Sequence, residues 1–309
     1  MKEKISSKGY YWGYKTVVTI THSGNKLTLS TADNTDIDYE VNSTDGGSPA
    51  SNTVTFYNIA KSHQSKIHKG DHIVIKSGPS DLYGVLSEGN ITNITPETLD
   101  SADKSFQITF TEGIDYSKDK RLYSKFNGSK MVKKTVTAGK TKVTYTKRQV
   151  KKVNIAFKKG VKAKQIIDRI KRDAKIEIEV CRLKKNKVYK KGYTLSSKPL
   201  AAIKAIAKDC GSKVYYRQGK LVIDDNAKPN PFNEHLYLDM KSGLTAEPTA
   251  DESDGGSKTY TLACFDDPRL SAGSAVYVKA TNISGLKRVK SVNHKHDKST
   301  YEMEVVVYA

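Results

Sequence analysis

A ten-residue pattern occurs twice in this chain, and it limits the possible folds more than any other feature. Residues 67–76 read IHKGDHIVIK, and residues 270–279 read LSAGSAVYVK. Each copy places a glycine where a chain leaving a tight turn often needs a positive φ, and then alternates apolar residues with the period of two typical of a half-buried strand. Two copies in register predict two related small β units. We expect Ile73 and Val276 to occupy equivalent strands.

Strands are expected at all-β spacing on both sides of the two copies, separated by turn segments rich in Gly, Ser, Asn and Asp. The expected strands are 15–21, 26–31, 37–42, 52–58, 72–76, 82–89 and 105–111 in the first half and 235–240, 258–265, 275–279, 286–293 and 300–308 in the second. The pattern predicts a small β-barrel at 1–114 and another at 229–309. Residues 1–15, which carry Lys, Tyr and Trp, are either a docking arm or an N-terminal strand.

The period changes to that of a helix near residue 152. Isoleucines in 163–174 share one helical face, and a second helix is expected within LSSKPLAAIKAIAKDCG, with Ser196 or Ser197 as its cap and Gly211 at its end. Strands precede, separate and follow these helices. Residues 151–228 therefore predict an α+β domain of βαββαβ type, ferredoxin-like or close to it.

The segment 115–150 is poor in large apolar residues and alternates Lys and Thr around Gly139, which predicts an inserted basic hairpin. The whole chain has a net charge of +20, and residues 118–172 contain 20 Lys and Arg but only two acidic residues. Such a stretch suits an anionic partner, whether nucleic acid, cell-wall polymer or an acidic protein face. It equally suits an exposed hairpin that lysines keep soluble and unpaired, which we favour.

Composition excludes several classes of protein. The chain has 309 residues, of which 37% are hydrophobic, so it can bury a core, and no apolar run approaches the roughly 20 residues needed to span a bilayer. The N-terminus lacks the apolar region of a signal peptide, so we expect synthesis without export. The three cysteines show no C-x-x-C spacing, which indicates neither disulfides nor zinc.

Candidate catalytic and metal-binding residues are few. No metalloprotease, nucleophile-elbow, P-loop or dinucleotide motif is present. Two histidine groups could in principle bind a transition metal. The candidates are His63, His68 and His72, together with His294, His296 and Asp297. Strand alternation places His294 and His296 on one face, but we favour surface or turn histidines in both groups. Asp266 and Asp267 are either an acid pair or, before Pro268, the residues that shape a turn.

The first β segment resembles the first barrel of phage tail baseplate hub proteins, the late control protein D-like fold that type VI secretion spike proteins share. The resemblance rests on Tyr57, Asn58 and Ile59, then Lys69, Gly70 and Asp71, and a return strand. The middle segment and the closing RLSAGSAVYVK, GLKRVKSVNH and YEMEVVV are similar to the XkdQ-like hubs of Gram-positive contractile tails and prophages. Asp71 is replaced by Ser274 in the second copy, so no single residue carries a function.

The resemblance implies a homotrimer in which two barrels per chain alternate in a ring of pseudo-sixfold symmetry that joins a tail tube to a central spike. The implied partners are the tube, the spike and other baseplate proteins, with neither a membrane nor specific nucleic-acid binding. The implied location is the virion tail baseplate, assembled in the host cytoplasm. Some hubs carry C-terminal enzymatic extensions, and this chain stops at the second barrel. We therefore expect no enzyme, no cofactor, and no catalytic, cofactor-binding or metal residues. The alternative function is a basic binding module for cell-wall polymer or nucleic acid.

Overall fold

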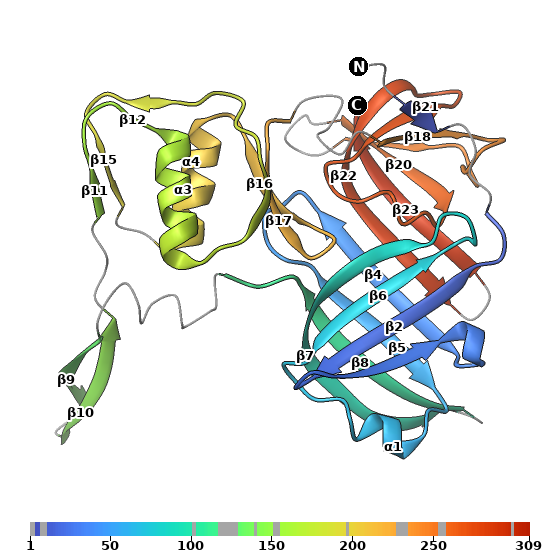
Figure 1. The fold of residues 1–309 in the computed structure, drawn as a ribbon, viewed down its shortest axis with the longest axis horizontal. Helices are drawn as coiled ribbons and strands as arrows, with labels where there is room; N and C mark the ends of the chain where they lie inside the picture. Colours follow the sequence, from blue (N-terminus) through green and yellow to red (C-terminus); the bar gives the residue numbers. More distant parts are fainter. Residues whose placement is uncertain are drawn as a thin grey trace. The chain divides into compact units, whose positions relative to one another are not determined.

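The computed structural model describes residues 4–6, 11–100, 103–116, 129–138, 141–150, 155–195, 198–226, 234–252, 258–297 and 300–309. The chain divides into two units. The first, here called the β unit, comprises Met1–Ile114, Glu179–Arg182 and Lys213–Ala309. The second, here called the α+β unit, comprises Asp115–Ile178 and Leu183–Ser212. The prediction of a mainly β chain with a small α+β insert is confirmed (Figure 1).

One hydrogen-bonded sheet runs through the β unit in the order β1-β18-β21-β22-β4-β5-β8-β7-β6-β2-β3, and β23, β20 and β19 branch from β22. The strands of its first half are β1 (Lys4–Ser6), β2 (Lys15–His22), β3 (Asn25–Ser30), β4 (Ile37–Thr44), β5 (Ser51–Tyr57), β6 (His72–Gly78), β7 (Gly84–Asp100) and β8 (Asp103–Glu112). Those of its second half are β18 (Glu234–Asp239), β19 (Thr249–Glu252), β20 (Lys258–Phe265), β21 (Ala275–Lys279), β22 (Ser284–Asp297) and β23 (Thr300–Tyr308). A 3-10 turn, η1 (Thr31–Asp33), and a one-turn helix, α1 (Lys61–Gln64), complete the first half.

Each half of the sheet encloses its own apolar core. The first core is built from alternate residues of β2 to β8, among them Val54, Phe56 and Ile108, which are fully buried. The second core is built from β18 and β20 to β23 and includes Leu262 and Val305. The antiparallel pairing of β4 with β22 joins the two halves (Figure 1). The chain therefore carries two β modules within one continuous sheet.

The repeated pattern forms the same structure in both modules. Gly70 and Gly273 both have positive φ, at 93° and 79°. Gly70 N–H donates to Ile91 and Gly273 N–H to Val289, at 2.8 and 3.1 Å, and these acceptors lie on β7 and β22. Ile73 pairs with Gly89, and Val276 pairs with Lys287, at the equivalent place on the return strand. The predicted structural equivalence of the two copies is confirmed.

The N-terminal arm packs against the second module of its own chain. Strand β1 pairs in parallel with β18, and the ring of Tyr11 stacks on Phe265 with centroids 5.3 Å apart. Tyr14 stacks on Tyr301 in the same way, at 4.3 Å. Of the two expectations, the docking arm describes residues 1–15 better, because the rings of Tyr11 and Tyr14 pack against aromatic residues of the second module.

Two strand assignments in the β unit differ from expectation. Strand β7 continues to Asp100 because β8 pairs with it as far as Asp100, opposite Asp103. The register between the two strands shifts twice along the way. Residues 249–252, which lie between the expected strands 235–240 and 258–265, form β19 against β20. The alternation rule missed them because both segments are polar, and β19 is exposed throughout.

The α+β unit contains helices α3 (Ala163–Ala174) and α4 (Pro199–Asp209), which contact one another along their apolar faces (Figure 1). Its strands are β11 (Ile155–Phe157), β12 (Val161–Lys162), β14 (Val188–Tyr189) and β15 (Tyr193–Leu195). Strand β13 (Ile178–Cys181), which from Glu179 onward belongs to the β unit, pairs within that unit with the hairpin of β16 (Lys213–Arg217) and β17 (Lys220–Asp224).

The region 151–228 has two helices separated by strands, as predicted, but its described elements run ββαβββαββ instead of βαββαβ. It also lacks the single sheet of a ferredoxin-like fold. Among the described residues its strands form three small sheets, β11-β15, β12-β14 and β13-β17-β16, because the strands are mostly two to four residues long. Gly211 follows α4 with φ 71°, as predicted. The proposed caps Ser196 and Ser197 lie outside the described residues.

Within the predicted basic segment, β9 (Ser129–Ala138) and β10 (Thr141–Val150) pair in antiparallel register. Within the described part of the chain, neither strand pairs with another strand. None of the described helices is long and apolar enough to cross a membrane. None of the three cysteines, all of which lie in the described part of the chain, forms a disulfide, and Cys210 and Cys264 are buried, as is usual for core residues.

Candidate functional site

The loop between β20 and β21 carries two fully buried carboxylates, Asp266 and Asp267. Asp267 accepts hydrogen bonds from the backbone N–H of Arg269 at 3.0 Å and from its guanidinium at 2.9 and 2.6 Å. This arrangement is the turn-shaping role expected before Pro268. The two carboxylates do not act as an acid pair, because each binds a different cation.

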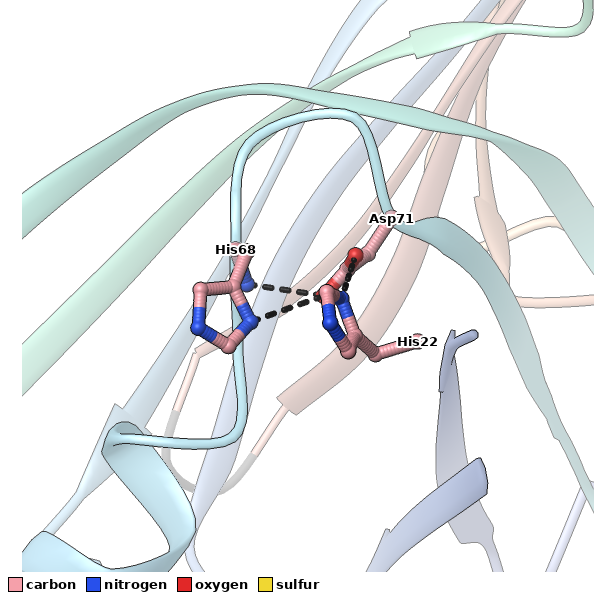
Figure 2. A group of neighbouring side chains, drawn as sticks. All are labelled: His22, His68 and Asp71. Carbon is pink, nitrogen blue, oxygen red and sulfur yellow. Dashed lines mark hydrogen bonds and ion pairs between the residues drawn. The ribbon is translucent and has the colours of Figure 1, made fainter. Parts of the chain in front are cut away.

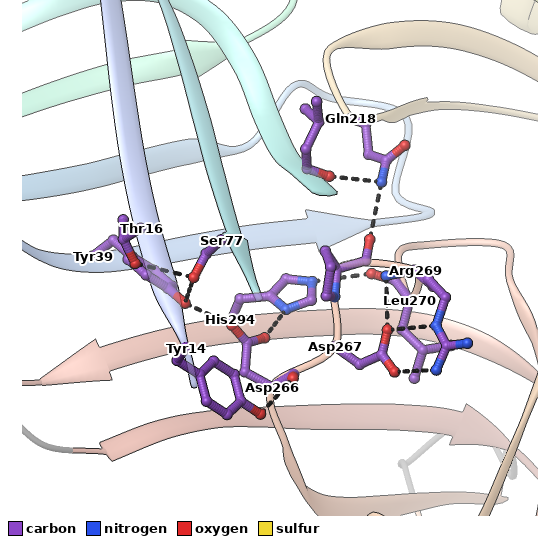
Figure 3. A network of polar contacts seen from close by, with 12 residues as sticks. Tyr14, Thr16, Tyr39, Ser77, Gln218, Asp266, Asp267, Arg269, Leu270 and His294 are labelled. Carbon is purple, nitrogen blue, oxygen red and sulfur yellow. Dashed lines mark hydrogen bonds and ion pairs between the residues drawn. The ribbon is translucent and has the colours of Figure 1, made fainter. Parts of the chain in front are cut away.

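Asp266 is the centre of a buried polar network (Figure 3). Its Oδ1 lies 2.5 Å from Nδ1 of His294, and its Oδ2 accepts from the Tyr39 hydroxyl at 2.6 Å. His294 Nε2 lies 3.0 Å from the carbonyl oxygen of Leu270. Because both ring nitrogens face acceptors, both must carry protons, and His294 is an imidazolium. Burial opposes this charge, but the Asp266 carboxylate and the Leu270 carbonyl hold the pKa of His294 above 6.5.

The network continues into the first module. The Tyr39 hydroxyl lies 2.9 Å from Ser77 Oγ, which lies 3.0 Å from Thr16 Oγ1. Burial and the Asp266 carboxylate raise the pKa of Tyr39 well above its usual value, so the phenol stays protonated. Residues of β2, β4 and β6 are thereby bonded to the β20–β21 loop and to β22. The network fastens the two modules at their junction.

This constellation has little capacity for acid–base catalysis. A general base needs a free lone pair within reach of a substrate proton. Both nitrogens of His294 are already engaged as donors, and the residue is only 1% exposed. The Asp–His pair therefore fits a structural ion pair better than a catalytic dyad.

The prediction that His294 and His296 are surface or turn residues is wrong. Both are buried, at 1% and 6% exposure, and Lys295 between them is exposed. Strand β22 continues to Asp297 with β4 on one side and β23 on the other, so its inward face includes both histidines. Their predicted common face is confirmed. Val292, His294 and His296 alternate along β22, so a buried Val292 would have predicted that both histidines point into the interior.

A second buried ion pair was not anticipated from the sequence. Asp224 Oδ2 accepts from the Tyr215 hydroxyl at 2.7 Å and from the Arg288 guanidinium at 2.8 Å. Asp224 is fully buried and Arg288 is 4% exposed. The pair bonds the β16–β17 hairpin to β22. Neither residue lies in a motif, and a charged residue in a strand usually indicates an exposed face, so only the fold brings them together.

The first histidine group is only partly assembled. His68 lies beside Asp71 and His22, a residue that the sequence did not single out (Figure 2). His63 lies in α1, and His72 points to solvent at the start of β6. Surface positions, which we favoured for these three histidines, agree with the exposure of His68 and His72. The group that the structure assembles differs from the candidate trio, because β2 pairs with β6 and brings His22 to the repeated turn.

No model of a known protein family matches the sequence, and no curated protein matches it. Solved structures of tail proteins do share its fold. The 43 kDa tail protein of prophage MuSo2 from Shewanella oneidensis superposes with a TM-score of 0.63 at 10% identity, over 96% of this chain and 98% of that one. A tail protein from Neisseria meningitidis MC58 gives a TM-score of 0.58 at 10% identity, over 96% and 97%.

A third similar structure extends the comparison to secretion. The E. coli c3393 protein, described as a component of the type VI secretion system with structural similarity to the T4 bacteriophage tail proteins gp27 and gp5, gives a TM-score of 0.55 at 11% identity. The match covers 88% of this chain and 73% of that protein. This chain therefore has the fold of phage tail proteins, as the resemblance of its sequence to tail baseplate hubs predicted.

Proposed function

We propose that this protein is a structural component of the tail of a phage or a phage-tail-like particle. The observation that carries the proposal is the agreement of fold with two tail proteins over nearly the whole length of all three chains. The buried network at Asp266 supports a structural role, because its polar groups form hydrogen bonds that join the two modules. A non-enzymatic protein without a cofactor, located in the virion after assembly in the host cytoplasm, follows from the same proposal.

Within the tail, we propose the position of baseplate hub. The two modules repeat the same turn with the same backbone hydrogen bonds, so three copies of the chain would present six similar positions around an axis. Such a homotrimer could match a six-fold tube on one side and a three-fold spike on the other. Rings are the usual closed form of head-to-tail contacts between identical subunits.

Sheet edges offer a means of closing such a ring. Among the described strands, β3 and β19 each pair with a single neighbour, so each has one unpaired edge. Unpaired edges are ready sites for pairing with another chain. In the proposed hub these edges, or surfaces beside them, contact the next copy, the tail tube or other baseplate proteins of a contractile tail.

Native mass spectrometry and light scattering across a range of protein concentrations test the hub. We expect a species of three times the 34.2 kDa chain, and ring-shaped particles in negative-stain images. A protein that remains monomeric at its highest soluble concentration, alone and with its tube and spike neighbours, would contradict the ring. The tail role itself is tested separately by mass spectrometry of purified tails.

The basic hairpin supports a second candidate, a binding module for cell-wall polymer or nucleic acid. Strands β9 and β10 pair only with each other among the described residues, and Lys133 is exposed. Binding driven by phosphates weakens steeply as salt rises. Retention on DNA or teichoic acid that disappears in moderate salt and on deletion of the hairpin would favour this candidate.

A further inference from the structure

Three metal-ligating side chains converge at the turn of the first repeat copy (Figure 2). His22 ends β2, while His68 and Asp71 flank Gly70 in the turn before β6. His22 Nδ1 lies 2.6 Å from Asp71 Oδ1, and His68 Nδ1 lies 3.7 Å from Asp71 Oδ2. One ligand atom from each residue lies within 4.8 Å of the others, and the two imidazole rings are in contact, with centroids 4.3 Å apart and planes tilted by 37°.

The second repeat copy shows that the turn itself does not need these side chains. In the first copy, Asp71 Oδ2 accepts from the backbone N–H of His68 at 2.7 Å. In the second, Ser274 Oγ accepts from the backbone N–H of Ser271 at 3.2 Å, at the equivalent place. Two serines thus build the same turn. Folding of the turn therefore requires neither the carboxylate of Asp71 nor the imidazole of His68.

We propose that His22, His68 and Asp71 form a binding site for a divalent transition-metal ion such as Zn²⁺. Two imidazole nitrogens and one carboxylate oxygen are a ligand set that zinc commonly takes, with a water molecule completing the tetrahedron. Magnesium and calcium prefer oxygen ligands, so the two imidazoles select against them. The proposal does not depend on the role of the protein in a tail.

The geometry needs only small adjustments to hold the ion. Metal–ligand distances of about 2.0–2.2 Å put tetrahedral ligands about 3.3 Å apart. His22 Nδ1 and Asp71 Oδ1 would separate slightly from their hydrogen bond, and the nitrogen of His68 would move closer. Both histidine side chains are about half exposed, at 46% and 51%, so they can turn freely. Asp71 is 6% exposed and is oriented by the His68 N–H, as a carboxylate ligand normally is by a second hydrogen bond.

Isothermal titration calorimetry of the tag-free, metal-stripped full chain with Zn²⁺ tests the site, with Mg²⁺ titrated in parallel. We expect one Zn²⁺ per chain at pH 7.5 and no heat from Mg²⁺. Zn²⁺ should also raise the melting temperature, since it binds the folded state alone.

Matched variants separate a built site from adventitious zinc binding. His22→Asn and His68→Asn should each weaken Zn²⁺ binding by about tenfold or more, whereas His63→Asn should bind as the unchanged chain does. Asp71→Ser reproduces the turn of the second copy, so it should fold normally, as circular dichroism would show, yet lose Zn²⁺. Absence of binding in the unchanged chain, or equal binding by the His22, His68 and His63 variants, would overturn the proposal.

Discussion

Replacing Asp266 by Asn tests whether the buried network holds the two modules together. The carboxylate accepts two short hydrogen bonds, one from the His294 imidazolium and one from the Tyr39 hydroxyl. An Asn side chain has one acceptor oxygen, so its NH₂ group must face one of these donors. The substitution also leaves the charge of His294 buried without its counterion.

The expected loss of stability follows from these contacts. A hydrogen bond to a charged group contributes about 1.5–3 kcal/mol, and breaking a buried ion pair by removing one partner costs about 3–5 kcal/mol. Because Asn can keep one of the two bonds, we expect a loss of about 3 kcal/mol, at the lower end. For a domain the size of the β unit, each kcal/mol shifts the melting temperature by about 2–4 °C, which gives a decrease of about 6–12 °C.

Differential scanning calorimetry at fixed protein concentration measures this shift. Asp297→Asn is the control, since Asp297 is exposed on the same strand as His294 and should melt as the unchanged chain does. In a chain that already carries His294→Gln, Asp266→Asn should lower the stability clearly less, because no imidazolium is left without a counterion. A shift below about 2 °C for Asp266→Asn alone would refute the assignment of a charged, structural pair.

The same pair predicts a dependence on pH. The folded-state pKa of His294 lies above the value of 6.5 for the unfolded chain, so the folded state binds this proton more tightly. Its contribution is fully present below pH 6.5 and is lost as the pH rises through the folded-state pKa. The difference in stability between the unchanged chain and His294→Gln should therefore shrink in alkaline buffer.

Three further predictions concern other parts of the chain. Burial raises the pKa of Glu112 from 4.5 to about 7, so its ionised form opposes folding increasingly as the pH rises from 4.5 to 7. Because each pKa unit corresponds to about 1.4 kcal/mol, Glu112→Gln should add about 3 kcal/mol to the stability at pH 8 and almost nothing at pH 4, as measured by urea unfolding. Gly273→Ala should destabilise more than Gly70→Ala: both have positive φ, costing about 1–2 kcal/mol, but only at Gly273 would the new methyl overlap the Tyr215 hydroxyl. Deleting residues 130–147 through a Gly-Ser linker should leave the melting temperature of the β unit unchanged while weakening assembly with tail partners; unfolding of the chain would contradict it.

The fold was predictable where apolar periodicity was strong. The alternation in β2, β5 and β6 and the isoleucine stripe of α3 gave the elements almost to their ends, since burial of one face dictates the pattern. The joining of both modules into one sheet was not predictable. It depends on the pairing of β4 with β22, about 250 residues apart, and backbone hydrogen bonds between such strands leave no local signal.

The polar networks were harder to predict than the fold. Asp266 precedes a turn proline, and His294 lies among lysines, so each looks exposed when judged by its neighbours in sequence. Only the tertiary pairing shows that both are interior and 2.5 Å apart. The group of His22, His68 and Asp71 was not predictable for a similar reason, because His22 reaches Asp71 through the β2–β6 pairing and not through spacing along the chain.

The two repeat copies have the same backbone but opposite surroundings, and this difference accounts for their divergence in sequence. In the second copy Leu270, Ser271 and Ala272 are buried, and Gly273 lies against Tyr215 of the β16–β17 hairpin. Only small side chains fit there. In the first copy residues 68–70 are exposed, so the same positions are free to carry His and Lys. The repeated pattern thus keeps the turn that folding requires, while its other side chains differ according to the environment of each copy.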